Sequence, residues 1–234
     1  FSDAMVHWLS KWYAAKSPGA RAALLAQFRP GYFAPVIALM KGLTDPICGL
    51  LMGQTAENLA HRFAITRRDM DEYSARSHAR VLAAQKAGHY ANEVLPIHDR
   101  SGALYAADDG VREDSTVENL AKLKPFFDRK YGNVTAGNSS QVTDGGAWVI
   151  VASQRAVDEH KLAPIGRIVD SQWAGLDPAQ MGLGPVHAAS PILARHKLGL
   201  DDVDAWELNE AFAAQVLACE RAWANDAFCR DELG

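Results

Sequence analysis

Three short, mainly apolar runs place the tightest constraint on how this chain can fold. They cover residues 147–152, 165–169 and 203–208. Runs of this length without polar alternation are typical of strands that are buried on both faces of a parallel sheet. The segment 185–197, between the second and third runs, has a helical pattern that is stopped by Gly199. Strands and helices are therefore expected to alternate, which predicts an α/β fold for this part of the chain.

Helical patterns dominate the residues that precede these runs. An apolar stripe over residues 2–13, followed by Pro and Gly breakers, predicts two short helices. Thr55 and Thr66 are predicted N-caps of later helices, and the helix after the second of them is expected to end near Gly88. The stretch 99–116 carries too much charge for a core position. A mainly helical region thus precedes the α/β region.

The apolar segment 32–52 is long enough to raise the question of a membrane span. Helix breakers and charges interrupt it, so a buried loop or short helices are expected instead. The interrupting residues are Pro35, Lys41, Gly42, Asp45 and Pro46.

Composition excludes several classes of protein. A chain of 234 residues that is 48% apolar can bury a substantial core in one or two domains. Its net charge of −4 argues against bulk affinity for nucleic acid or for an anionic membrane. The three cysteines, Cys48, Cys219 and Cys229, form no even, closely spaced set, and no secretory leader is visible. A reducing compartment is expected, cytoplasmic or alternatively mitochondrial.

Two polar segments lie beside the expected strands. Residues 209–215 (Asn-Glu-Ala-Phe-Ala-Ala-Gln) directly follow one apolar run, and the Gly- and Ser-rich loop 135–146 leads into another. Binding and catalytic residues are often found on such connections. Taken alone, Asn209 is predicted to be the N-cap of a core helix. The apolar face of that helix would carry Phe212, Val216, Cys219 and Trp223.

Together these two segments resemble the thiolase family. Three further blocks occur in family order and extend the resemblance over nearly the whole chain: 52–58 (Met-Gly-Gln-Thr-Ala-Glu-Asn), 120–127 and 181–185 (Met-Gly-Leu-Gly-Pro). The resemblance implies a thiolase-like layered α/β fold, incomplete here, with a mainly helical loop domain. The implied parts are a loop domain that covers the coenzyme A site (1–140), a strand and helix that return to the N-terminal half (141–163), and the first part of the C-terminal half (164–234).

Members of this family carry a nucleophilic Cys, a Gly-His-Pro segment and a second catalytic Cys, and this sequence has no counterpart of them. We therefore expect an interior fragment that by itself lacks the nucleophile and the catalytic His. The full-length protein is expected to be an acetyl-CoA acyltransferase of fatty-acid β-oxidation, which cleaves 3-ketoacyl-CoA with coenzyme A. A biosynthetic acetoacetyl-CoA thiolase and a non-catalytic acyl-CoA-binding or scaffold protein are the alternatives.

The resemblance also implies roles for individual residues. Asn209 matches the Asn that holds a water in an oxyanion hole, Arg112 an Arg at the adenosine end of coenzyme A, and Ser140 a Ser that contacts pantetheine. The alternatives are a helix cap for Asn209, a solvated surface residue for Arg112 and a turn residue for Ser140. Leu51 stands where many short-chain thiolases have a His, which favours the degradative, broad-chain branch. Positions that match the acyl and pantetheine slot, and are equally compatible with core packing, are Met52, Phe127, Ala136, Met181, Ala211 and Phe212.

The resemblance implies no cofactor, because coenzyme A is a substrate. No metal site is expected either, since no His-Glu-x-x-His or His and Cys zinc spacing occurs, and phosphate-loop and hydrolase-elbow motifs are absent from the sequence. The expected partners are acyl-CoA, coenzyme A and a second copy of the chain in a homodimer or higher oligomer. The Trp-rich segment 2–13 resembles an insertion of thiolases that pair with a multifunctional β-oxidation subunit, with core packing as the alternative.

Overall fold

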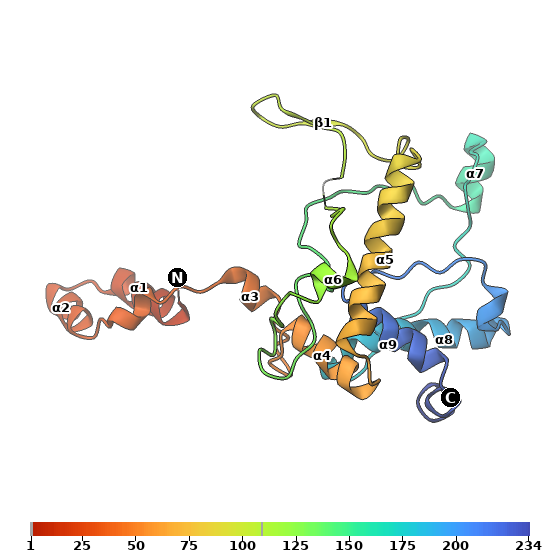
Figure 1. The fold of residues 1–234 in the computed structure, drawn as a ribbon. Coiled ribbons are helices and arrows are strands. Elements are labelled where there is room, and N and C mark those ends of the chain that lie inside the picture. Colours follow the sequence, from red (N-terminus) through yellow and green to blue (C-terminus); the bar gives the residue numbers. More distant parts are fainter. Residues whose placement is uncertain (1, 109) are drawn as a thin grey trace. The chain divides into compact units, whose positions relative to one another are not determined.

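The computed structural model describes residues 2–108 and 110–234, and the chain divides after Leu51 into two units (Figure 1). The first unit is a small helical assembly. Its elements are α1 (Asp3–Ala14), α2 (Pro18–Ala26), the 3₁₀ turn η1 (Pro30–Phe33) and α3 (Ala38–Gly42). The two short helices expected at the start of the chain are confirmed.

Side-chain caps and aromatic contacts stabilise this first unit. Ser2 and Ser17 each accept a backbone N–H in the first turn of α1 and α2, which satisfies a donor that has no partner within the helix. Trp8 packs against Trp12 with ring centroids 5.3 Å apart and against Phe28 at 4.9 Å.

The segment 32–52 consists of the end of η1, the short helix α3 and turns, as expected. In the described residues, no helix combines the length and apolar character that a membrane span requires.

The second unit contains a helical core with long connections. Its helical elements are α4 (Met52–Arg62), α5 (Arg67–Lys86), α6 (Val117–Leu120), α7 (Gln154–His160), η2 (Pro178–Leu183), α8 (Gly184–His196), η3 (Leu200–Asp202), α9 (Ala213–Trp223), α10 (Asp226–Phe228) and η4 (Cys229–Leu233). Its strands are β1 (Ile97–His98) and β2 (Leu104–Tyr105), which pair antiparallel in an exposed hairpin.

The core lies where α4, α8 and α9 meet η2 and where α5 packs against α9 (Figure 1). Leu59, Met70 and Leu183 are fully buried there. Burying each such side chain contributes roughly 1.5–3 kcal/mol. Gly182 lets η2 approach closely, because a Cβ at that position would lie 2.6 Å from a methyl carbon of Leu59 and 2.8 Å from Gln215 Cγ. Small residues of α9 allow its own close packing: Ala213, Ala214, Ala218 and Ala222.

Helix boundaries follow the sequence signals in most places. Thr66 caps α5 in a reciprocal capping box with Asp69, and Gly88 follows the end of that helix with a φ of 76°. The helix expected over 185–197 is present as α8. The N-cap prediction for Thr55 is wrong, because Thr55 lies inside α4 and its hydroxyl donates to the carbonyl of Met52 at 2.7 Å.

The N-cap prediction for Asn209 is also wrong. Helix α9 begins at Ala213, so Phe212 occupies the cap position and Asn209 lies outside the helix in an exposed segment. Phe212 has no side-chain oxygen to offer, and the N-terminal end of α9 instead bonds to another loop, since the N–H of Ala213 donates to the carbonyl of Asn138 at 3.0 Å.

The strands expected over 147–152, 165–169 and 203–208 are wrong for the described structure. None of the three segments is paired with a strand within residues 2–108 and 110–234, and each runs as coil. The apolar side chains of the first two runs are exposed, with Trp148 and Ile150 each 96% accessible, whereas Leu208 of the third run is partly buried against the core. A strand is stabilised by the backbone hydrogen bonds of its neighbour, so an apolar run without that neighbour cannot form a sheet.

Glu57 of α4 holds the start of an irregular segment, 133–140. Its carboxylate accepts the backbone N–H groups of Asn133 and Val134, each at 2.9 Å. Gly132 is required beside it, because a Cβ there would lie 2.3 Å from Glu57 Oε1. The carboxylate thereby replaces the regular backbone pairing that this segment lacks.

Asn138 fixes the middle of the same segment from inside. Its Oδ1 accepts the N–H of Thr135 at 2.8 Å, and its Nδ2 donates to Asp71 Oδ1 and to the carbonyl of Asn133, both at 3.1 Å. Asp71 of α5 is 1% exposed and also accepts from Arg67 Nε at 2.8 Å. Buried polar groups are tolerated when they are paired in this way. The shape of segment 133–140 therefore depends on α4 and α5.

Substituting Asp71 tests this dependence. Asp71→Ala should lower the free energy of unfolding by about 3 kcal/mol, because Arg67 and Asn138 lose a buried partner. Denaturant unfolding followed by circular dichroism measures the change. Glu72→Ala is the matched control, since Arg68–Glu72 has the same i,i+4 spacing on the same helix but Glu72 is 49% exposed. It should have little effect, and equal losses in the two variants would contradict the buried role of Asp71.

Cys219 offers a second test of the core. It lies on α9, and burial raises the pKa of its thiol to about 11. In the native chain Cys219 should react with iodoacetamide at pH 8 far more slowly than Cys48 or Cys229, because the thiolate is the reactive form. Mass spectrometry of the modified peptides measures the three rates. All three should react alike in guanidinium, and a native Cys219 that reacts as fast as the others would show that the site is open.

Candidate functional site

Backbone pairing joins the two polar segments that stand out in the sequence. The N–H of Ser140 donates to the carbonyl of Ala211 at 2.8 Å, and the N–H of Ala213 donates to the carbonyl of Asn138 at 3.0 Å. Ser139 and Phe212 face each other as an isolated antiparallel bridge between these bonds. The Gly- and Ser-rich loop is thus aligned with the Asn-Glu-Ala-Phe segment, although about seventy residues of sequence separate them.

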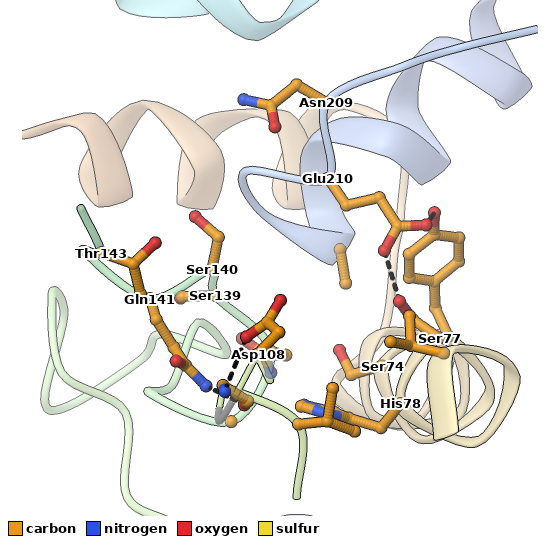
Figure 2. Close-up of a pocket in the computed structure, with 17 residues that line it drawn as sticks. Ser74, Ser77, His78, Asp108, Ser139, Ser140, Gln141, Thr143, Asn209 and Glu210 are labelled. Atoms are coloured by element: carbon orange, nitrogen blue, oxygen red, sulfur yellow. Dashed lines mark hydrogen bonds between the residues drawn. The ribbon is translucent and has the colours of Figure 1, made fainter. Parts of the chain in front are cut away.

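A pocket of about 480 Å³, the Asn209 pocket, opens beside this pairing (Figure 2). One face of α5 forms a wall, and the two paired segments and the loop around Asp108 form the rest. The residues that line it are Tyr73, Ser74, Ser77, His78, Val81, Asp108, Gly110, Val111, Gly137, Asn138, Ser139, Ser140, Gln141, Thr143, Asn209, Glu210 and Ala213. Hydroxyl and amide groups predominate, so the pocket offers many hydrogen-bond donors and acceptors and few charges.

Glu210 makes the main side-chain contact between the Asn-Glu-Ala-Phe segment and α5. Its carboxylate accepts the hydroxyl of Tyr73 at 2.7 Å and the hydroxyl of Ser77 (Figure 2). Burial raises the pKa of Tyr73, and the hydrogen bond to Glu210 raises it further. The phenol therefore stays protonated and remains a donor throughout the neutral pH range.

His78 and Gln141 contact the loop that carries Gly110 and Arg112 at the edge of the pocket. The backbone N–H of Arg112 donates to His78 Nδ1 at 3.3 Å. The side-chain amide of Gln141 donates to the carbonyl of Gly110. Both contacts hold the charged loop around Asp108 against the pocket.

The expected site residues divide between the pocket and its surroundings. Asn209 and Ser140 both line the pocket and are exposed to solvent. Arg112 is exposed next to the lining residue Val111 and does not line the pocket itself. Leu51 belongs to the first unit, where it forms a backbone bridge with Thr44.

An apolar cluster accounts for several of the expected slot residues. The rings of Phe127 and Phe212 meet edge to face with centroids 6.1 Å apart. Gly53, next to Met52 in α4, gives Phe127 its place, because a Cβ at Gly53 would lie 2.1 Å from the ring. Ala211 is partly buried in the adjoining segment, whereas the remaining expected residues, Met52, Met181 and Ala136, are exposed.

Sequence reasoning did not assign Glu210, Tyr73, Ser77 or His78 to the site. A signal was present for three of them, because two hydroxyl residues spaced i,i+4 interrupt the apolar stripe of α5 and Glu210 is adjacent to Asn209. Across residues 2–108 and 110–234, no three His, Cys, Asp or Glu side chains are grouped so as to hold a metal ion.

Comparison with known proteins identifies the family of this chain. Residues 27–155 match the family model of the thiolase N-terminal domain, and residues 162–228 match that of the thiolase C-terminal domain. The chain is 48% identical over 170 residues to a 3-ketoacyl-CoA thiolase of Saccharophagus degradans, covering 71% of this chain and 44% of that protein. It is 44% identical over 188 residues to the mitochondrial 3-ketoacyl-CoA thiolase of Homo sapiens, covering 79% of this chain and 47% of that one.

Solved structures give the same result. The crystal structure of human mitochondrial 3-ketoacyl-CoA thiolase in complex with CoA matches with a TM-score of 0.75 and 43% identity, over 81% of this chain and 47% of that one. The crystal structure of Bacillus anthracis acetyl-CoA acetyltransferase matches with a TM-score of 0.76 and 41% identity, over 81% and 49%. The chain spans a little under half the length of the curated relatives it matches. With both domain models matched in order, this chain belongs to the thiolase family and has part of the thiolase fold.

Proposed function

We propose that this chain forms the coenzyme A side of the active site of an acyl-CoA thiolase. The reaction would cleave 3-ketoacyl-CoA with coenzyme A to acetyl-CoA and a shortened acyl-CoA, as in fatty-acid β-oxidation. One observation carries the proposal: the pairing of segments 138–140 and 211–213 brings Ser140 and Asn209 to one pocket. The relatives named 3-ketoacyl-CoA thiolase, and the human enzyme solved with CoA, support the same reading.

Thiolysis requires hydrogen-bond donors aimed at carbonyl oxygens. A thiolate attacks the thioester, and negative charge develops on oxygen in the transition state, so a donor that is already oriented lowers the barrier. We assign this role to Asn209, whose carboxamide is exposed at the pocket rather than used as a helix cap. It would act through a water that it holds.

Coenzyme A requires three different surroundings. Its pantetheine amides need neutral donors and acceptors, which Ser140 and the neighbouring lining residues supply. Its reactive end needs an apolar slot, for which the Phe127–Phe212 ring pair is suited. Its phosphates need a cation at a wet site, and Arg112 is exposed beside the pocket rim. No cofactor is needed for this chemistry.

An acetyl-CoA acetyltransferase is the second candidate. The structure of the Bacillus anthracis enzyme of that name and that of human mitochondrial 3-ketoacyl-CoA thiolase both match this chain with a TM-score of 0.76. Leu51 favours the degradative reading, because an apolar side chain at a position where many short-chain thiolases have His would not orient a polar acyl branch. Relative kcat/KM for acetoacetyl-CoA and longer 3-ketoacyl-CoA substrates separates the two.

The biological setting follows from the same proposal. We infer a homodimer or higher homo-oligomer, with a multifunctional β-oxidation subunit as a further partner. The relatives include mitochondrial and peroxisomal proteins as well as bacterial ones, and we assign a cytoplasmic location with a mitochondrial one as the alternative. The proposed division remains a loop domain over 1–140, a returning strand and helix over 141–163 and the C-terminal half from 164 to 234.

Asn209 gives the direct test of this function. In a protein that carries this chain together with its nucleophilic cysteine, Asn209→Ala should lower kcat by roughly 10²–10³-fold and leave KM nearly unchanged, because an oxyanion donor acts mainly in the transition state. Steady-state kinetics with acetoacetyl-CoA and coenzyme A measures both constants. An unchanged kcat in the variant would show that Asn209 has no role in catalysis. An unchanged unfolding midpoint is the control that the variant folds as the wild type does.

Arg112 tests the phosphate end. Arg112→Glu should weaken coenzyme A binding roughly 5-fold at low salt, about the effect of one exposed ion pair, and the difference should shrink as salt screens the contact. Isothermal titration calorimetry at two salt concentrations measures the affinity. Arg155→Glu, an exposed residue of α7, is the matched control. If the Arg112 variant binds coenzyme A at low salt as tightly as the wild type does, Arg112 is an ordinary surface residue.

A further inference from the structure

Glu210 and Asn209 are adjacent in the sequence but their side chains point apart. Figure 2 shows the Asn209 amide directed away from Glu210, whose carboxylate reaches toward α5. There it accepts the hydroxyl of Tyr73 at 2.7 Å and the hydroxyl of Ser77. The Glu210 side chain is therefore held by the protein, whereas the Asn209 side chain is available to contact a ligand.

The segment around Asn209 has few other constraints on its backbone. Upstream, the last backbone hydrogen bond runs from Val203 to Leu200, and downstream the next is the one from Ser140 to Ala211. In the described part of the chain, the Asn209 side chain makes no hydrogen bond of its own, and Glu210 provides the side-chain hydrogen bonds nearest to it. The Asn209 side chain is therefore oriented through its backbone, which Leu208 holds on one side by packing against the core and Glu210 holds on the other by its hydrogen bonds.

The two hydroxyl donors on α5 are well placed to hold that backbone. Tyr73 and Ser77 are four residues apart, so they lie on one face of the helix. Two donors to one carboxylate restrict its rotation more than a single donor would, and hydrogen bonds to a charged acceptor are the stronger kind. Because burial raises the pKa of Tyr73, its phenol keeps the proton that it donates at neutral pH.

We infer that Glu210, clamped by Tyr73 and Ser77, is a positioning residue that holds the backbone of Asn209 in the orientation its amide needs at the pocket. The expected effect on kcat rests on the proposed function, whereas the expected effect on the mobility of the Asn209 backbone does not. Removing the clamp should free the segment while leaving the core of α4, α5 and α9 intact, since the carboxylate lies outside that core.

The mechanical part is tested on this chain by ¹⁵N relaxation. In the wild type the backbone order parameter of Asn209 should be near the rigid value of about 0.85, and in the Tyr73→Phe, Ser77→Ala double variant it should fall below about 0.6. Both substitutions keep the helix and nearly all of the packing, and circular dichroism checks that they do. Glu207→Gln, at an exposed carboxylate in the same segment, is the control and should change nothing.

Kinetics in the protein that carries the nucleophilic cysteine then separates the inference from the function. The double variant should lose roughly 10- to 100-fold in kcat with little change in KM, as a misplaced catalytic group would. Glu210→Gln keeps one oxygen that can accept a hydroxyl, so it should lose less than Glu210→Ala. Lower order together with lower kcat supports both claims. Lower order with an unchanged kcat supports the clamp and overturns the role of Asn209, and unchanged order in the double variant overturns the clamp.

Discussion

Two carboxylates on neighbouring helices support an irregular loop, and the site depends on that support. Glu57 and Asp71 reach segment 133–140 from α4 and α5, and between them they satisfy backbone N–H groups and the Asn138 amide. A loop of this kind satisfies only some of its own polar groups when it is buried, so the helices must satisfy the others. Without these contacts, segment 138–140 would have no fixed edge to offer to 211–213.

These contacts explain how residues of irregular segments can occupy defined positions around a polar pocket. Helices α4 and α5 are positioned by the buried core, and the helices position the loop. The Asn-Glu-Ala-Phe segment is then held by the loop, by the Glu210 contacts to α5 and by the start of α9. The residues at the end of this series, Ser140 and Asn209, can therefore be exposed and still occupy defined positions.

Local signals predicted helices well, and they failed where the outcome depended on distant contacts. The Thr66 capping box and the α8 pattern are encoded within a few residues, and both are confirmed. The run 147–152 was predicted to be a strand from its composition, but a strand depends on a neighbour that composition does not reveal. Asn209 failed as a cap for a related reason. Its segment is held through Ser140 and Glu210, whose partners are remote in the sequence.

The site could be predicted only in part. Resemblance to a family singled out Ser140 and Asn209, and the structure brings these two to one pocket, while their roles stay predictions. Glu210, Tyr73 and Ser77 were missed because their contacts join residues that are 137 and 133 positions apart in the sequence. Only the folded chain shows that α5 turns that face toward the Asn-Glu-Ala-Phe segment (Figure 2).

The exposed run at 147–151 has a consequence for how the chain behaves in solution. It presents an unbroken series of apolar side chains, including Trp148 and Ile150, on a backbone whose donors and acceptors have no strand beside them. Segments with this combination of β propensity, low charge and free edges readily template intermolecular sheets. We therefore expect this chain to self-associate through the run as its concentration rises, in competition with the folded form that carries the pocket.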